Sequence, residues 1–236
     1  MIRINFISVL ILTFISVTAF AQDNNIKLGF SDAFLGHLNL SYEKMVNEKN
    51  TFQVKIGYWQ PTISPFIDDE TISPEAFTLK ESNGGLNTSV EYRFYMSGNT
   101  TPTGIYLAPY FRYFSQSALF SDQIDGKAFD VDTRLNTVGV GAQIGYQLII
   151  NEIFTFDFYF FGAGIDHHNL KMVYQLQQAQ AGFDYDSITD DVSEVFEDIN
   201  YLESKLEHKV TDDNLTSKLP FLFPGFRIGV SVGVAF

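Results

Sequence analysis

The last eleven residues, Phe226 to Phe236, alternate between apolar and polar or small side chains. The even positions are Phe226, Ile228, Val230, Val232, Val234 and Phe236, and the odd positions are Arg227, Gly229, Ser231, Gly233 and Ala235. A period of two is typical of a β-strand with one apolar face and one face that tolerates charge. Such a strand, ending in an aromatic residue, is expected where a sheet closes into a barrel inside a lipid bilayer.

The same alternation recurs along the chain and predicts further strands. The predicted strands cover residues 26–30, 38–43, 52–59, 86–96, 105–116, 138–148, 154–160 and 226–236. Bacterial barrels of this type have an even number of strands, which favours reading 26–30 and 38–43 as two strands. We therefore predict an all-β fold, an antiparallel up-and-down transmembrane β-barrel of eight strands.

The start of the chain and its composition predict export. Arg3, an apolar run from Phe6 to Phe20 and the sequence Ala19-Phe20-Ala21 are typical of a signal peptide over residues 1–21, which leaves one domain over 22–236. The formal net charge of −13 argues against nucleic acid as a partner. The chain has no cysteine, so disulfides cannot stabilise it. Residues 22–236 contain no apolar run long enough for a membrane-spanning helix.

The predicted connections fall into two classes by length. Short turns near residues 47–50, 97–104 and 151–152 are expected on the periplasmic side, and long extracellular loops are expected at about 61–85, 121–133 and 169–224. In the last loop, residues 187–206 change to a helical period with an apolar stripe. We expect this helix to rest on the barrel rim or on the 61–85 loop. A lid over the lumen and a partner-binding helix are the alternatives.

Two segments resemble a known group of proteins. FLGHLNLSYEKMVNEKNTFQVKIGYW (Phe34 to Trp59) and the terminal FRIGVSVGVAF are similar to small outer-membrane barrel proteins of Bacteroidota. The resemblance implies an outer-membrane location and recognition by the barrel assembly machinery through Phe226, Val232, Val234 and Phe236. It implies no reaction. We expect a monomer without cofactor, in contact with outer-membrane lipids and lipopolysaccharide.

Charged residues occur at positions that the alternation assigns to the barrel interior. They are Lys27, Glu43, Lys55, Glu91, Arg93, Arg112, Asp157 and Arg227. An eight-stranded barrel is just wide enough for its interior to be filled by side chains, and a buried charge without a partner costs several kcal/mol. A salt-bridged interior that closes the lumen is therefore expected. A narrow conducting path lined by the same charges is the alternative.

Asp166, His167 and His168 lie at the predicted outer end of a strand. A histidine at such a rim could activate Ser115, Ser117 or Ser121 in a lipid hydrolase. The spacing matches no catalytic signature, so we expect no enzyme and keep a hydrolase that uses His167 or His168 as an alternative. A zinc site that adds His37 is disfavoured, because adjacent histidines on a strand point to opposite faces.

Acidic residues gather in the predicted loops, for example Asp68-Asp69-Glu70 and the segment 184–213. Divalent cations could bridge them to lipid phosphates, although solubility explains the charge equally well. The leading functional hypothesis is a structural or surface-interaction role through the long loops. The alternative is transport of a small ionic or apolar solute through or beside the barrel, for which Pro109 on the lipid-facing side is a local indication because proline removes a ladder donor.

Deletion of Phe236 is expected to lower the amount of folded protein in the outer membrane, because the terminal aromatic strand is the expected assembly signal. Immunoblotting of heat-modifiable protein in membrane fractions measures this amount. Normal assembly of the deletion variant would contradict the role of the terminal strand in targeting.

Overall fold

The computed structural model describes residues 23–31, 37–60, 77–97, 101–124, 126–178, 183–194 and 200–236. The predicted signal peptide lies outside this part of the chain. The strands are β1 (Asn24–Gly29), β2 (His37–Asn47), β3 (Asn50–Trp59), β4 (Phe77–Tyr95), β5 (Gly104–Ile124), β6 (Lys127–Ile150), β7 (Phe154–Leu176), β8 (Glu207–Val210) and β9 (Leu215–Ala235). The helical elements are η2 (Tyr185–Ile188), α4 (Thr189–Glu194) and α5 (Asn200–Glu203). No helix in the described part is long and apolar enough to cross a membrane.

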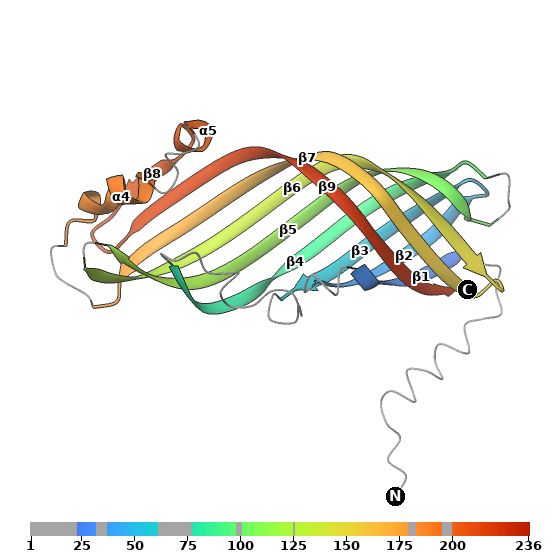
Figure 1. Cartoon of the computed structure of the whole chain (residues 1–236), viewed down its shortest axis with the longest axis horizontal. Helices are drawn as coiled ribbons and strands as arrows, with labels where there is room; N and C mark the ends of the chain where they lie inside the picture. Colours follow the sequence, from blue (N-terminus) through green and yellow to red (C-terminus); the bar gives the residue numbers. More distant parts are fainter. Residues whose placement is uncertain are drawn as a thin grey trace, which may run out of the picture.

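The strands form one antiparallel sheet that closes into a ring (Figure 1). Their order is β1-β2-β3-β4-β5-β6-β7-β9-β8, and β1 also pairs with β9. Strands β1 to β7 and β9 therefore make the ring, while β8 pairs only with the start of β9. Backbone hydrogen bonds between Asn24 and Phe236 complete the closure. The predicted all-β antiparallel sheet is confirmed.

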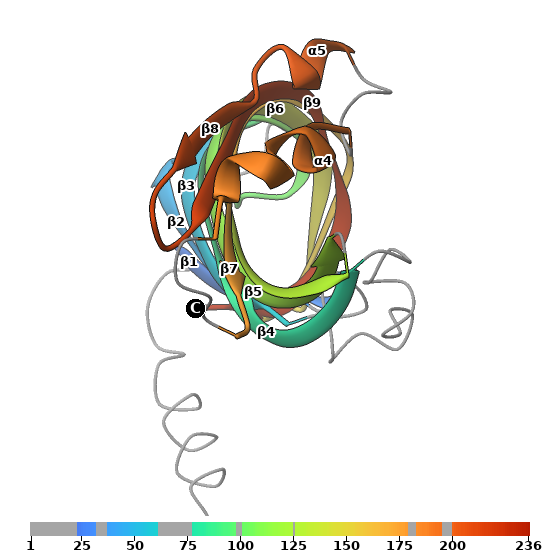
Figure 2. The same cartoon turned by 90° about the vertical axis from the view of Figure 1, so that its left-hand side faces the viewer.

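The ring has two different ends. The end at which the chain finishes, here called the terminal end, carries the tight turns after β2 and β6. Asn151 and Glu152 in one of these turns have positive φ angles of 51° and 62°. The opposite end, here called the helix end, carries η2, α4, α5 and β8, and α4 lies over the upper part of the ring in the view of Figure 2.

The wall of the ring is much taller on one side than on the other. Strands β1, β2 and β3 have 6, 11 and 10 residues, whereas β4, β5, β6, β7 and β9 have 19 to 24. We call the part that includes β1 to β3 the terminal half, and the part built by the long strands alone the helix half.

The predicted loops 121–133 and 169–224 are wrong over much of their length, because strands occupy these residues. The predicted loop 61–85 is shorter than expected. Residues 121–133 form the ends of β5 and β6 around a turn at Gly126, whose φ is +71°. The predicted loop 169–224 overlaps the end of β7 and the start of β9, and β4 begins at Phe77 inside the predicted loop 61–85. These strand ends carry polar residues on their outer face, so their alternation did not look like that of a half-apolar strand.

In the terminal half, polar side chains lie inside the ring and apolar side chains lie outside. Buried interior residues include Lys27, Glu43, Gln53, Glu91, Arg93, Gln147 and Asp157. Exposed outer residues include Leu40, Val54, Ile56, Val90, Phe94, Leu107, Phe111, Val140, Ile144 and Phe158. Inward glycines make room for tyrosines at the centre, since a Cβ on Gly145 would collide with the ring of Tyr106.

In the helix half the arrangement is reversed. An apolar cluster, here called the lid cluster, lies inside and consists of Phe129, Val131, Met172, Tyr174, Tyr185, Ile188, Val192 and Leu215. Asp132, Arg134 and Lys171 are exposed on the outer face. Ile188 and Val192 thus hold η2 and α4 against the inside of the strands. The predicted helical stretch 187–206 is only partly described, because residues 195–199 lie outside the described part.

A β-bulge in β7 changes which residues face inward. The register of β7 shifts between Tyr159 and Gly162 against β9, and an extra residue is accommodated near Phe160 and Phe161. Odd positions face inward before the bulge and even positions after it. Asp166 and His168 therefore point into the ring, and His167 points out.

Candidate functional site

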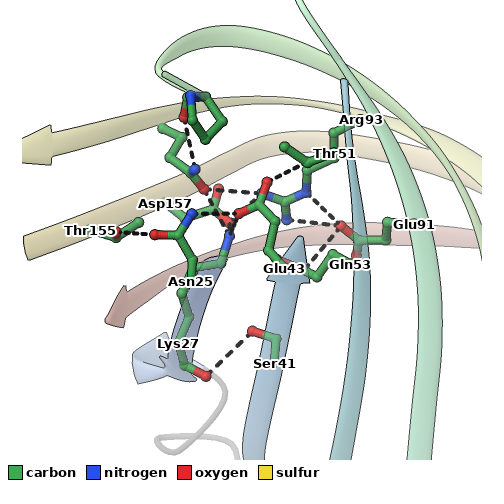
Figure 3. Close-up of polar contacts among 12 residues, drawn as sticks. Asn25, Lys27, Ser41, Glu43, Thr51, Gln53, Glu91, Arg93, Thr155 and Asp157 are labelled. Atoms are coloured by element: carbon green, nitrogen blue, oxygen red, sulfur yellow. Dashed lines mark hydrogen bonds and ion pairs between the residues drawn. The ribbon is translucent and has the colours of Figure 1, made fainter. Parts of the chain in front are cut away.

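A network of ion pairs crosses the interior of the terminal half (Figure 3). Asp157 on β7 accepts hydrogen bonds from Lys27 Nζ at 2.9 Å, Arg93 Nη1 at 2.7 Å and Tyr106 Oη at 2.7 Å. Lys27 lies on β1, Arg93 on β4 and Tyr106 on β5. One carboxylate thus joins four strands of the ring.

Glu43 and Glu91 form the other two centres of this network. Glu43 accepts hydrogen bonds from Lys27 Nζ at 2.6 Å and from the hydroxyl of Tyr95 at 2.8 Å. Glu91 accepts two hydrogen bonds from Arg93, at 2.9 and 3.2 Å, and one from Arg227 Nη2 at 3.2 Å. The desolvation cost of burying these charges is offset because each is paired and further hydrogen-bonded.

The network fills the interior with side chains that are already engaged. Lys27, Glu43, Glu91, Arg93 and Asp157 are all at most 2% exposed. Every carboxylate among them is paired with at least one buried cation. The arrangement links β1, β2, β4 and β7 across the interior.

A second group of charges lies above the network, toward the helix end. Arg112 forms an ion pair with Asp166 across β5 and β7. The guanidinium of Arg227 lies over the ring of Tyr110, 4.4 Å from its centroid, and Lys55 Nζ lies 4.9 Å from the centroid of Tyr159. The structure therefore places all eight interior charges that the sequence singled out inside the ring, and it adds Asp166 to them.

A pocket of about 290 Å³ opens beside this second group of charges. We call it the seam pocket. It is lined by His37 and Asn39 of β2, Lys55 of β3, Asn87 and Ser89 of β4, Arg112 of β5, Tyr159 of β7, and Phe226, Arg227 and Ile228 of β9. The lining joins interior cations to Phe226 and Ile228, which face outward, so the pocket lies in the wall of the ring.

The pocket occurs where β9 lacks a neighbouring strand in the described part of the chain. On the side of β9 away from β7, pairing with β1 ends at Ser231 and pairing with β8 begins at Lys218. The N–H of Val230 donates to Ser31 Oγ at 2.9 Å, and that of Leu222 donates to the hydroxyl of Tyr201 at 3.4 Å.

Two prolines of β9 occupy even-numbered positions, as Leu222 and Val230 do, so their backbone nitrogens face the side of β9 away from β7. Pro220 and Pro224 stand where an N–H would otherwise point toward the gap between β1 and β8. Proline is typical of such edges because it has no N–H to satisfy. Pro109, which the sequence suggested as a sign of a lateral opening, does not line the pocket and pairs with Ala142.

The predicted rim site Asp166-His167-His168 does not form a catalytic arrangement. Asp166 is engaged by Arg112, and His167 is exposed on the outer face. His168 Nδ1 lies 2.8 Å from Thr137 Oγ1, and its ring stacks on Phe221 at a centroid distance of 4.8 Å. Ser115 instead donates to Asn136 Oδ1 at 2.7 Å.

The structure shows a serine–histidine–serine contact that the sequence analysis missed. His208 Nε2 lies 3.1 Å from Ser193 Oγ, and Nδ1 lies 2.9 Å from Ser217 Oγ. Ser193 donates its proton to the carbonyl of Thr189, so Nε2 must carry the proton that it shares with Ser193. Burial lowers the pKa of His208. Ser217 is fully buried, and the contact ties β8 and α4 to β9.

Within the described residues, no group of three or more histidine, cysteine or acidic side chains could hold a metal ion. His37 lies against Trp59 and Phe114 in the seam pocket, whereas His167 faces outward on β7. Asp68-Asp69-Glu70, an acidic segment that divalent cations could bridge to lipid phosphates, lies outside the described part of the chain.

Replacement of Asp157 by Asn is expected to destabilise the protein by roughly 3–5 kcal/mol, because two buried cations lose their shared counter-charge. Urea unfolding followed by fluorescence of Trp59, the only tryptophan, measures the change. The matched control is Asp130→Asn, which breaks a partly exposed pair with Lys80 and should cost at most about 1 kcal/mol. Equal effects of the two substitutions would contradict the importance of the buried network.

The chain belongs to the DUF3575 family, described as "Protein of unknown function (DUF3575)", whose model matches residues 6–182. No curated protein matches the sequence, and no solved structure matches the fold.

Proposed function

We propose that this member of the DUF3575 family is a β-barrel of the bacterial outer membrane, with a closed lumen and a structural or surface-interaction role. The observation that carries the proposal is the reversal of polarity along the ring. The terminal half has apolar side chains outside and charges inside, which suits a lipid surrounding. The helix half has the opposite arrangement, which suits water.

The height of the apolar belt supports this proposal. On β6 the outward residues are apolar from Val138 to Ile150, whereas Asn136, Arg134 and Asp132 follow toward the helix end. These thirteen positions span about 40 Å along the strand, or about 28 Å across a bilayer at a 45° tilt. That height matches the hydrocarbon core of a membrane.

The outward apolar residues also give way to polar ones on the neighbouring strands. Val138 pairs with Tyr113 on β5 and with His167 on β7, and His167 pairs with Leu222 on β9. Beyond these paired positions the outward residues of β5 and β7 include Ser115, Ser117, Asn169 and Lys171. A change from apolar to polar outward residues on adjacent strands is expected near a bilayer surface, and it would leave the helix half in the extracellular water.

The interior favours a closed barrel over a channel. In support, the ion network crosses the interior of the terminal half, and the lid cluster packs against β6, β7 and β9 inside the helix half. A transport role beside the lumen remains the second candidate, because the seam pocket opens through the wall. The hydrolase alternative gains no support from the geometry of His167, His168 or His208.

Replacement of Ile144 by Lys, near the middle of the belt, is expected to destabilise the protein in lipid by roughly 2–4 kcal/mol, because a charge would face acyl chains. Urea-dependent unfolding in phosphatidylcholine vesicles measures the effect. Val210→Lys in β8 is the control, since Val210 lies at the helix end, beyond the belt, and should tolerate the charge. A neutral Ile144→Lys variant would contradict insertion by this face.

Wild-type protein in planar bilayers is expected to pass no steady ion current, because paired side chains block the interior. Single-channel recording in 1 M KCl is the measurement, with a known porin as the positive control. A reproducible current that Arg112→Ala abolishes would contradict the closed lumen and favour the transport role.

A further inference from the structure

Of the residues that the structure describes, those lining the seam pocket include three cations and no carboxylate. The cations are Lys55, Arg112 and Arg227. Asp166 pairs with Arg112 and Glu91 pairs with Arg227 from outside the lining. A cationic lining favours an anionic ligand.

Two buried polar atoms on the pocket lining have no hydrogen-bond partner among the described residues. They are Arg227 Nη1 and Ser89 Oγ. Ser89 is 3% exposed, and the side chain of Arg227 is 10% exposed. A buried donor without a partner costs free energy, so both atoms are placed to bind a group that enters the pocket.

The outer margin of the same pocket is apolar and faces away from the ring. Phe226 is 70% exposed and Ile228 is 76% exposed, so both would contact acyl chains in a bilayer. Arg227 lies between them in sequence and points to the opposite face of β9. Lipid-facing and cation-bearing surfaces thus meet at one strand, where β9 has no neighbouring strand in the described ranges.

We propose that the seam pocket binds the phosphate of an anionic membrane lipid, which enters sideways between β9 and β2 while its acyl chains stay against Phe226 and Ile228. This inference rests on the proposed membrane location. The guanidinium of Arg227 supplies the free donor, Ser89 supplies a hydroxyl, and Arg112 and Lys55 supply further positive charge.

The size and depth of the pocket agree with this ligand. About 290 Å³ accommodates a phosphate with its glycerol or sugar carbons and leaves the chains outside. Phe226 lies four residues below the belt boundary at Leu222, which corresponds to about 9 Å of depth at a 45° tilt. The headgroup therefore descends slightly below the bilayer surface, where its charge interacts with arginine in a low-dielectric surrounding.

The test uses Trp59, the only tryptophan, as a reporter beside the pocket. Its ring lies 6.0 Å from that of His37, which lines the pocket. The full-length mature protein is reconstituted in phosphatidylcholine vesicles that contain, at equal mole fraction, either 6,7-dibrominated phosphatidylglycerol or 6,7-dibrominated phosphatidylcholine. We expect stronger quenching by the anionic lipid, and a relative affinity at least about tenfold lower in Arg227→Gln.

Three variants separate the pocket from bulk charge and from misfolding. Arg134→Gln removes an exposed arginine on the outer face of β6 and should keep the excess quenching. Arg227→Lys keeps the charge that pairs with Glu91 but loses the forked donor, so it should fold and bind weakly. Ser89→Ala removes only the orphan hydroxyl and should reduce the preference partially.

Each remaining outcome overturns a specific claim. Equal quenching by the two lipids, or excess quenching that Arg227→Lys and Ser89→Ala leave unchanged, overturns the lipid site. Loss of the excess on addition of 10 mM inorganic phosphate would make the ligand a free anion and would also overturn it. Failure of the protein to float with vesicles in a density gradient would instead overturn the proposed membrane location.

Discussion

The buried ion network is the interaction on which the rest of the ring depends. Lys27, Glu43, Glu91, Arg93 and Asp157 come from β1, β2, β4 and β7, so their pairing fixes strands that are far apart in the sequence. Burying charges at this depth is costly unless they are paired and hydrogen-bonded. The three carboxylates of this network are each paired with at least one of its cations.

The reversal of polarity divides one continuous sheet into two environments. Long strands such as β6 pass from an apolar outer face to a polar one without a break in pairing. The interior changes in the opposite sense, from the ion network to the lid cluster, in which Val192 and Ile188 pack against Phe129 and Leu215. The elements η2 and α4 are therefore part of the core of the helix half.

The unequal strand lengths generate the most distinctive feature of the wall. Because β1 has only six residues, it covers only the last part of β9. Along this edge of β9, Pro220 and Pro224 have no N–H to satisfy, and the hydroxyl groups of Tyr201 and Ser31 accept hydrogen bonds from the N–H groups of Leu222 and Val230. On the same edge Arg227 follows the outward-facing Phe226, so the lining of the seam pocket contains both cationic and outward-facing apolar side chains.

The sequence alone determined the all-β class and which side chains of the terminal half share a face, because a period of two assigns each residue to one side of a strand. It also singled out the interior charges. It missed the strand ends at 121–133, the inward turn of Asp166 and the contacts of His208, since a bulge at Phe160–Phe161 and polar outer faces leave no periodic signal. Only the tertiary structure decided which charges pair and where the wall opens, because pairing and closure depend on strand lengths and register between segments distant in the chain.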